Sequence, residues 1–286
     1  MKITAFASTA AMLTLAATTA FAADGSFERT LSTGSSPNVS VITGSGQIRL
    51  HPGSGNQIHI VAHIRSSHGW MSGGSDTDSR IQQIISNPPI LQSGNDITIG
   101  ERHSEDRYRN ISIDYDITLP HDSTINSTTG SGDVDIQDVG ASVKAQSGSG
   151  NVHVHGVQGM TTLGTGSGDI DLQQIGPGDV KAETGSGNIQ LHGLNGALKA
   201  STGSGDITAE GQPTSDWKLS TGSGSVRLAV GNALFNLDAD TGSGNINVAQ
   251  PMTMQGSLNR HHVSGVVGGG GPALRIGTGS GDISIK

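Results

Sequence analysis

The sequence has no cysteine, and aromatic residues make up only 3% of its 286 residues. The absence of cysteine excludes a disulfide framework, a thiolate metal site and a lipid-modified cysteine. Hydrophobic residues reach only 33%, which is low for a globular core of ordinary shape. A thin stacked structure needs fewer bulky side chains, because small aliphatic residues can fill it layer after layer.

The chain also lacks a long hydrophobic run after its first 22 residues, so we expect no integral membrane span. Residues 1–22 have the pattern of a signal peptide: Lys2 is positive, residues 3–17 are apolar, and Ala20-Phe21-Ala22 is a small-x-small cleavage site. A transmembrane anchor is less favoured, because the apolar run is short and interrupted by Thr and Ser. We therefore expect export, to the periplasm or to the cell surface and exterior.

Positive charge is scarce, with 16 Lys and Arg against 24 Asp and Glu and a net charge of -8. Loss of Lys2 with the signal peptide would make the mature chain more negative by one charge. Such a balance disfavours nucleic acid and anionic lipid as partners. We expect an envelope protein or a glycan instead.

Glycine, in contrast, is abundant, with 44 residues. The sequence has no Gly-X-Y period and only nine prolines, so collagen is excluded and many turns are expected. The tetrapeptide Thr/Ser-Gly-Ser-Gly, followed by Asp, Asn or Ser and then by Ile or Val, recurs from residue 130 to the end of the sequence. Its paired glycines are Gly130 and Gly132, Gly148 and Gly150, Gly166 and Gly168, Gly185 and Gly187, Gly203 and Gly205, Gly222 and Gly224, Gly242 and Gly244, and Gly279 and Gly281.

Successive copies of this motif are separated by 18, 18, 19, 18, 19, 20 and 37 residues. The last interval spans two periods, which predicts one degenerate rung within residues 250–271 and about nine rungs in all. Apolar residues alternate after each motif, as at Val134 and Ile136, and before it, as at Val180 and Ala182. This alternation predicts two strands per rung, each with its apolar face turned inward.

A corner must separate the two strands of a rung. The inward positions Ala182 and Ile189 are seven residues apart, whereas residues on one face of an unbroken strand differ by an even number. Glycine suits a corner because it tolerates positive φ and close backbone approach. The predicted fold is therefore all-β, a β-solenoid or single-stranded β-helix with rungs of 18–20 residues over residues 130–286.

The residue after each motif should form a polar column along the stack. In chain order the column reads Asp133, Asn151, Asp169, Asn188, Asp206, Ser225, Asn245 and, beyond the degenerate rung, Asp282. No two aspartates are neighbours in this order. Two carboxylates one rung apart would repel by about 1 kcal/mol even in water, whereas Asn can donate a hydrogen bond to Asp. We infer that the alternation relieves repulsion and that the column needs no cation.

Residues 23–129 are predicted to form an N-terminal β-rich cap, as stacked repeats require. This region holds an isolated motif at residues 43–46 and then departs from the period. Strands are expected at 39–42, 57–64, 96–99 and 110–119, one short helix at 76–86, and exposed loops at 69–75 and 101–109.

The combination of an exported leader, strands with one short helix, the strand Tyr115-Asp116-Ile117-Thr118-Leu119-Pro120 and the repeated Thr-Gly-Ser-Gly-Asp-Ile rungs resembles a known family. It is similar to the bacterial "putative adhesin" family with β-strand repeats, a domain of unknown function. The resemblance covers nearly all of the mature chain and implies a secreted or envelope-associated β-solenoid. It brings no catalytic residues to carry over, and residues 250–271 depart from its rung pattern.

Calcium is one alternative, because Gly-Ser-Gly-Asp-Ile-Asp at residues 166–171 resembles half of a calcium β-roll repeat. The candidate ligands would be Asp133, Asp169, Asp206 and Asp282. The opposite halves of the rungs lack a regular Gly-Gly-x-Gly-x-Asp, and calcium needs six to eight oxygen ligands. We therefore predict no metal and no cofactor, with the calcium β-roll kept as an alternative.

Histidine is the other candidate metal ligand, with 11 residues. His153 and His155 share a strand face, as do His59 and His63. His155 and His192 take equivalent places two rungs apart, about 9.6 Å, which is wide for one ion. Our interpretation is that these are solvated surface histidines.

The threonines Thr165, Thr184, Thr202, Thr221 and Thr241 could form a flat hydroxyl array of the kind that orders water or ice. We favour a structural role, because threonine pairs with itself across strands.

The sequence shows no nucleophile elbow, phosphate loop or dinucleotide-binding motif. A sugar-cleaving site would need carboxylates beside stacking aromatics, yet Trp70 and Trp217 are the only tryptophans, and Trp217 lies in an inward column. The charged residues Glu101, Arg102, Glu105, Asp106, Arg107 and Arg109 are interpreted as a solvated loop. No catalytic residue is predicted.

The sequence thus predicts a non-enzymatic structural or interaction module at the bacterial envelope or outside the cell. The alternatives are a carbohydrate-binding or polysaccharide-cleaving β-helix and the calcium β-roll. Residues 282–286 follow the consensus strand pattern with nothing after them, which predicts an open edge strand that could mediate self-association.

Overall fold

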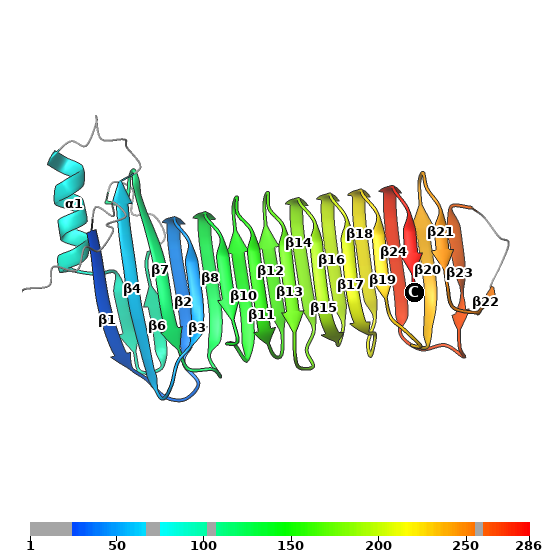
Figure 1. Cartoon of the computed structure of the whole chain (residues 1–286), viewed down its shortest axis with the longest axis horizontal. Helices are drawn as coiled ribbons and strands as arrows, with labels where there is room; N and C mark the ends of the chain where they lie inside the picture. The colour runs from blue at the N-terminus through cyan, green and yellow to red at the C-terminus, as the bar shows by residue number, and fades with distance from the viewer. Residues whose placement is uncertain (1–24, 67–74, 102–106, 255–259) are drawn as a thin grey trace, which may run out of the picture.

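The structure, a computed structural model, describes residues 25–66, 75–101, 107–254 and 260–286. Two long sheets face each other and run the length of an elongated stack (Figure 1). The predicted signal peptide, residues 1–22, lies outside the described residues. The expected loop at 69–75 and the central part of the loop at 101–109 also lie largely outside them.

Within the described residues, the first sheet has 12 strands and the second has 13. In spatial order the first sheet comprises β1 (Gly25–Ser32), β4 (Gln57–Ser66), β7 (Ile111–Leu119), β3 (Ile48–Pro52), β9 (Val134–Gln137), β11 (Val152–Val157), β13 (Ile170–Gln174), β15 (Ile189–Asn195), β17 (Ile207–Gln212), β19 (Val226–Ala229), β25 (Ile283–Ile285) and β21 (Ile246–Val248). The second sheet comprises β22 (Met252–Met254), β23 (His262–Val267), β20 (Phe235–Thr241), β24 (Ala273–Ser280), β18 (Trp217–Ser223), β16 (Leu198–Ser204), β14 (Val180–Ser186), β12 (Thr161–Thr165), β10 (Ser142–Ser147), β8 (Thr124–Ser131), β2 (Asn38–Ser45), β6 (Asp96–Ile99) and β5 (Ile90–Ser93). The helix α1 (Ser75–Ser86) lies at the N-terminal end.

The repeat places one strand of each rung in each sheet. A strand of the second sheet precedes each motif, a strand of the first sheet follows it, and the next rung stacks on it in parallel register. Val152 pairs with Val134 on one side and with Ile170 on the other, and Ile170 pairs with Ile189. All four side chains are fully buried between the sheets. The pairing confirms the predicted apolar columns and a solenoid-like, all-β fold.

The corner includes the whole predicted Gly-Ser-Gly in some layers and is shorter in others. β10 ends at Ser147 and β11 begins at Val152, so this corner spans residues 148–151. β8 runs through Gly130 to Ser131, and β9 begins at Val134, so this corner is only Gly132 and Asp133. Both glycines of a motif lie against the previous rung. A β-carbon on Gly166 would lie 2.5 Å from the carbonyl oxygen of Gly148, and any larger side chain would push the rungs apart.

The motif at residues 43–46, expected to stand alone, lies in the stack. Thr43 pairs with Thr129, and Ile48 pairs with Val134, so β2 and β3 form the layer next to β8 and β9. The prediction that the stack starts at residue 130 is therefore wrong. Residues 53–123 extend both sheets on the other side of this layer, with β7 beside β3 and β6 beside β2, before the chain returns to β8. Sequence spacing cannot reveal such an excursion.

The remaining N-terminal elements match the sequence prediction in part. β4, β6 and β7 lie where strands were expected, and the helix lies within one residue of its predicted start. The strands β1, β3 and β5 were missed. β1 pairs antiparallel with β4, which pairs antiparallel with β7, while Ile81 and Ile84 of α1 are buried.

At the opposite end, the chain order and the spatial order differ. The last strand pair, β24 and β25, lies between the β18–β19 layer and the β20–β21 layer. Ile283 pairs with Val226 on one side and with Ile246 on the other. The predicted open edge at residues 282–286 is therefore wrong, because β25 has a neighbour on both sides, and we no longer expect self-association through it.

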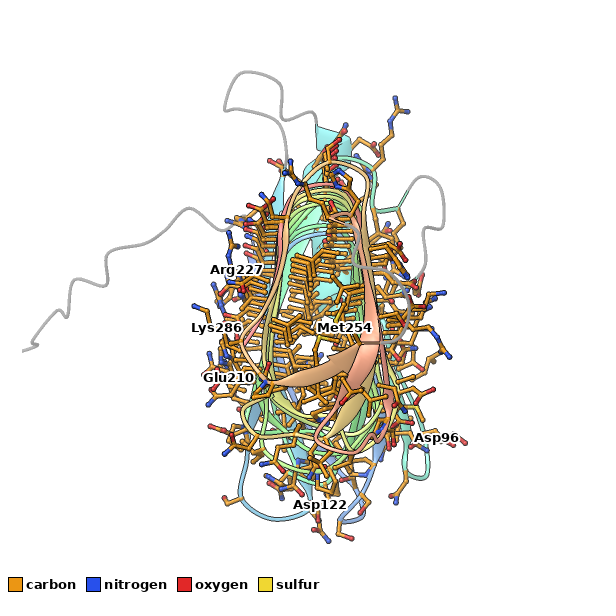
Figure 2. The ribbon with its side chains drawn as sticks, turned by 90° about the vertical axis from the view of Figure 1, so that its right-hand side faces the viewer. Asp96, Asp122, Glu210, Arg227, Met254 and Lys286 are labelled. Carbon is orange, nitrogen blue, oxygen red and sulfur yellow. The ribbon has the colours of Figure 1, made fainter. Side chains whose placement is uncertain are left out.

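The predicted degenerate rung within residues 250–271 is also wrong. This stretch contains β22 and β23, which pair antiparallel with each other, and β23 pairs antiparallel with β20. Met252 and Met254 pack on the core at this end, and Met254 lies across the space between the sheets in Figure 2. The 37-residue interval is therefore an excursion that covers the end of the stack, followed by a return to an interior slot.

The close approach of the corners leads to a test by a single methyl group. In Gly168→Ala the new β-carbon would lie 2.2 Å from the carbonyl oxygen of Gly150, so we expect a destabilisation of about 1–3 kcal/mol, as for other overpacked sites. Gly277→Ala is the matched control, because nothing lies within 4 Å of its β-carbon and alanine is favoured over glycine in a strand. Thermal unfolding followed by circular dichroism measures both; equal midpoints for the two variants would contradict the packing argument.

Candidate functional site

The threonine column faces the interior. The five predicted hydroxyl-array residues are only 4–8% exposed. Each hydroxyl donates to the carbonyl oxygen of the second motif glycine in the adjacent layer, as Thr184 Oγ1 does to Gly168 at 2.9 Å. The same bond is made by Thr129, Ser147, Thr165, Thr202, Thr221, Thr278 and Thr241 at 2.8–3.0 Å. The ice-binding alternative is therefore wrong, because these hydroxyls are consumed inside the stack.

The aspartate and asparagine column forms a second ladder. Asp133 Oδ1 accepts from the backbone N–H of Asn151 at 2.8 Å, and Asn151 Oδ1 accepts from the N–H of Asp169 at 2.9 Å. The pattern continues through Asn188, Asp206 and Ser225. The expected side-chain donation from Asn to Asp occurs in this column only as a long 3.5 Å contact from Asn245 to Asp282, where the backbone N–H of Asn245 also donates to the same oxygen at 2.8 Å. At the other aspartates the donor is the backbone N–H of the next layer.

The spatial order of this column keeps the aspartates apart. Asp282 lies between Ser225 and Asn245, not beyond Asn245, because β25 is inserted there. No aspartate has an aspartate neighbour in the corrected order either. The four candidate calcium ligands are thus spread along the stack, about two layers or 9.6 Å apart at the closest, and are not gathered around one point.

Two carboxylates, Asp206 in the corner column and Glu183 on the second sheet, have lowered pKa values. The guanidinium of Arg227, 2.7 Å away, lowers the pKa of Asp206, and the backbone N–H of Ser225 adds to this effect. Hydrogen bonds from Lys199 and then Lys181 lower the pKa of Glu183. Both carboxylates are therefore ionised at neutral pH, and both are paired with cations on neighbouring layers.

The outer face of the first sheet brings together three candidate metal ligands. The ligand atoms of His153 and His155 on β11 and of Asp171 on β13 all lie within 4.8 Å of one another. His155 Nε2 is 3.7 Å from Asp171 Oδ2, and Gln173 Oε1 lies 3.4 Å from His155 Nδ1. Two imidazoles and a carboxylate are ligands that suit zinc. Asp171 was missed, although it follows His153 by one 18-residue period.

Two other candidate histidines lie beside carboxylates. His59 lies 3.5 Å from Glu28, and His192 lies 3.1 Å from Glu210. His155 and His192 are separated by Gln173 in register, as predicted. A second possible ligand group, exposed near the C-terminal end, consists of Asp238, Asp240 and His262.

The aromatic and charged candidates do not converge on a catalytic arrangement within the described residues. Trp217 is buried and donates through Nε1 to the carbonyl oxygen of Gly196 at 2.9 Å. Burial raises the pKa of Tyr115. Arg107 lies 3.9 Å from Glu101. Trp70 and residues 102–106 of the charged loop lie outside the described residues.

Among the helices of the described chain, none is long and apolar enough to cross a bilayer.

A family model described as Toastrack DUF4097 matches residues 75–286. No curated protein matches the chain. Among solved structures, one from Bacteroides fragilis described as a "putative adhesin" is 14% identical, with a TM-score of 0.48 over 92% of this chain and 97% of that one. Another, from Clostridium sporogenes and described as a "putative cell adhesion protein", is 12% identical, with a TM-score of 0.24 over 92% of this chain and 99% of that one. Sequence identities and TM-scores this low support no conclusion about function.

The alternation in the acidic column can be tested by adding one charge. Asn188→Asp keeps the oxygen that accepts from Asp206 N–H but places three carboxylates on successive layers. We expect a loss of about 1 kcal/mol at neutral pH. The repulsion exists only while the carboxylates are ionised, so the loss shrinks as the pH falls and acid protonates them.

Asn126→Asp is the charge-matched control. Its neighbours in register are Ser40 and Lys144, so the added carboxylate meets no like charge. Urea unfolding at neutral and acidic pH measures the difference, and a pH-independent loss in Asn188→Asp would contradict the electrostatic explanation.

The calcium alternative has a direct test. Since the column oxygens already accept backbone N–H groups, we expect the thermal midpoint to be the same, within about 2 °C, in excess calcium and in EGTA. A large fall in EGTA would instead identify the aspartates of the column as calcium ligands, because removing a ligand that binds only the folded state lowers its stability.

Proposed function

The chain belongs to the Toastrack DUF4097 family, and from this premise we propose that it is a non-enzymatic, exported interaction module at the bacterial envelope or outside the cell. Membership agrees with the resemblance found in the sequence, and that resemblance implies envelope association. The predicted leader at residues 1–22 supports export. N-terminal sequencing of the exported chain tests this point, and a first residue other than Ala23 would contradict the predicted cleavage.

The scaffold of this module is a β-solenoid of about nine rungs, with corners at the paired motif glycines. The N-terminal elements β1, β4 and β7 with α1 close one end, and β22 and β23 close the other. Closed ends fit a scaffold that acts as a separate unit, because stacked repeats need terminal segments that cover the last layer.

One observation carries the proposal: inward positions repeat, whereas outward positions at the same register differ. In the first sheet, the first inward-facing position of each strand from β9 to β19 is Val or Ile. The adjacent outward positions are Asp135, His153, Asp171, Gln190, Thr208 and Arg227. The stack thus holds individual side chains at a fixed spacing of about 4.8 Å, which is how a rigid binding surface is built.

Catalysis is less favoured than binding because the repeated polar groups have structural partners. The threonine hydroxyls and the column oxygens are engaged with the backbone of adjacent layers. The side chains left for contact with other molecules lie on the two flat outer faces. In Figure 2 Glu210 and Arg227 project from the first sheet, and Asp96 lies at the second.

The test is binding of the purified chain to isolated envelope fractions and to a glycan array, with release of reducing sugar measured in parallel. We expect saturable binding without sugar release. Two double variants compare the faces: Gln190→Ala with Thr208→Ala on the first sheet, and Lys199→Ala with Lys218→Ala on the second. We expect one pair to lose binding while the other retains it. Sugar release would support the cleaving alternative, and absence of binding to every fraction would contradict the proposal.

A further inference from the structure

Basic residues form a row, interrupted at Thr162, on the outer face of the second sheet. Register pairs Lys144 with Thr162, Thr162 with Lys181, Lys181 with Lys199, Lys199 with Lys218, and Lys218 with Arg275. We call the five cations Lys144, Lys181, Lys199, Lys218 and Arg275 the basic ladder. All five are exposed. In a chain with 16 Lys and Arg and a net charge of -8, this is a marked local concentration of positive charge.

The insertion of β24 extends the ladder. In chain order the strand after β18 in this sheet is β20, whose Asp238 would follow Lys218. In the structure Arg275 lies between them and pairs in register with both. Four cations therefore occupy the successive strands β14, β16, β18 and β24. Asp238 ends the ladder on this side, and Asn126 adjoins Lys144 on the other.

This row is costly for the fold. Like charges directly opposite each other in a sheet are destabilising, and two unit charges one layer apart repel by about 1 kcal/mol in water. The acidic column avoids this cost by placing Asn or Ser between its aspartates, whereas the ladder places four cations side by side. The stack is held by its inward columns and corner bonds, so it does not need the ladder.

The ladder already holds one carboxylate, which shows how it can hold another. Glu183 lies 2.9 Å from both Lys181 and Lys199. At the next two layers the position of Glu183 is taken by Ser201 and Ser220, and then by Gly277. Lys218 makes no ion pair within the described residues. The space between Lys199, Lys218 and Arg275 is thus open to carboxylates from outside.

A shallow depression lies beside the ladder. It is lined by Met160, Val180 and Leu198 together with Thr162, Lys181 and Lys199. Asp179 also lines it, and its Oδ1 accepts from the backbone N–H of Ala197 at 2.9 Å. Met160 is 61% exposed there. An apolar floor bordered by cations and a hydroxyl suits the face of a sugar ring that carries an acidic group.

We infer that the basic ladder binds an acidic polysaccharide, a polyuronate with one carboxylate per sugar residue, laid along the stack. The inference rests on the proposed function and names its partner class. The layer spacing of about 4.8 Å is close to the length of one sugar residue in an extended chain. A nucleic acid fits less well, because single strands bind through aromatic stacking and this face presents Met, Thr, Ser and Gly beside its cations.

The overall negative charge does not oppose this binding at physiological salt. Charges farther away than a Debye length of about 8 Å are largely screened, so a chain on the ladder responds mainly to the nearby cations. The nearest carboxylates, Asp179, Glu183, Asp216 and Asp238, number four against the five cations of the ladder. Asp216 is 3.9 Å from Arg275, and Glu183 is 2.9 Å from Lys199. Lys218, which makes no ion pair within the described residues, is therefore the centre of the site, with Lys199 on the next strand beside it.

The experiment is calorimetric titration of the purified chain with polygalacturonate over a range of salt concentrations. In Lys199→Gln with Lys218→Gln we expect affinity to fall at least about tenfold and the slope of log K against log salt to fall by about two, one for each lost contact. The matched control, Arg49→Gln with Arg227→Gln, removes two cations from the first sheet and should bind as the parent chain does. Thermal unfolding midpoints confirm that both variants are folded.

Any of the following outcomes would overturn the inference. Equal loss in both double variants would mean attraction by net charge alone, and absence of polygalacturonate binding at low salt would exclude a polyuronate. Equal affinity for neutral dextran would exclude recognition of the carboxylate. Tighter binding of a single-stranded oligonucleotide would reassign the ladder to nucleic acid. If the chain still binds envelope fractions in any of these cases, the proposed function stands while the polyuronate assignment fails.

Discussion

The fold depends on how closely the corners of successive layers approach. A β-carbon at the second glycine of a motif would lie about 2.1 Å from the carbonyl oxygen of the preceding motif, as at Gly150 against Gly132. That carbonyl accepts the hydroxyl of Ser147 from the same following layer. The glycine therefore sets the spacing, and the hydroxyl satisfies the polar group that the tight corner would otherwise bury unpaired. Strand register, the apolar columns and the acidic column all follow from this contact.

The two charged rows of the molecule obey opposite rules. Along the corners, carboxylates alternate with Asn or Ser, and each oxygen is engaged by the next backbone N–H. On the outer face of the second sheet, Lys181, Lys199, Lys218 and Arg275 follow one another without a neutral residue between them. The carboxylates are thus kept apart where their oxygens bind the backbone, whereas the cations on the exposed face are not. This difference is consistent with an exposed face that is used for binding.

The order of layers differs from the order of the chain at both ends. Residues 53–123 form strands on the other side of β2 and β3 before the chain returns to β8 and β9. The strands β24 and β25 are inserted between the β18–β19 layer and the β20–β21 layer. The returning strands carry the full motif, so Thr278 and Gly281 make the same bonds as their counterparts. Interchangeable corners permit this insertion, because every slot offers the same backbone acceptors. Because β24 is inserted next to β18, Arg275 lies beside Lys218 on the surface.

The sequence by itself determined the repeat, the inward columns such as Val152 and Ile170, the corner glycines and the separation of the aspartates, because each depends on spacing within a short period. Only the tertiary structure decided the slot of Ile283, the stacking of Thr43 on Thr129 and the neighbours of Arg275. A period reports which face a residue occupies, but not which layer comes next when the chain makes a long excursion. Asp171 beside His155, and the cations from Lys144 to Lys218, were missed for a different reason. The period gives their spacing, but surface rows carry no apolar pattern to mark them.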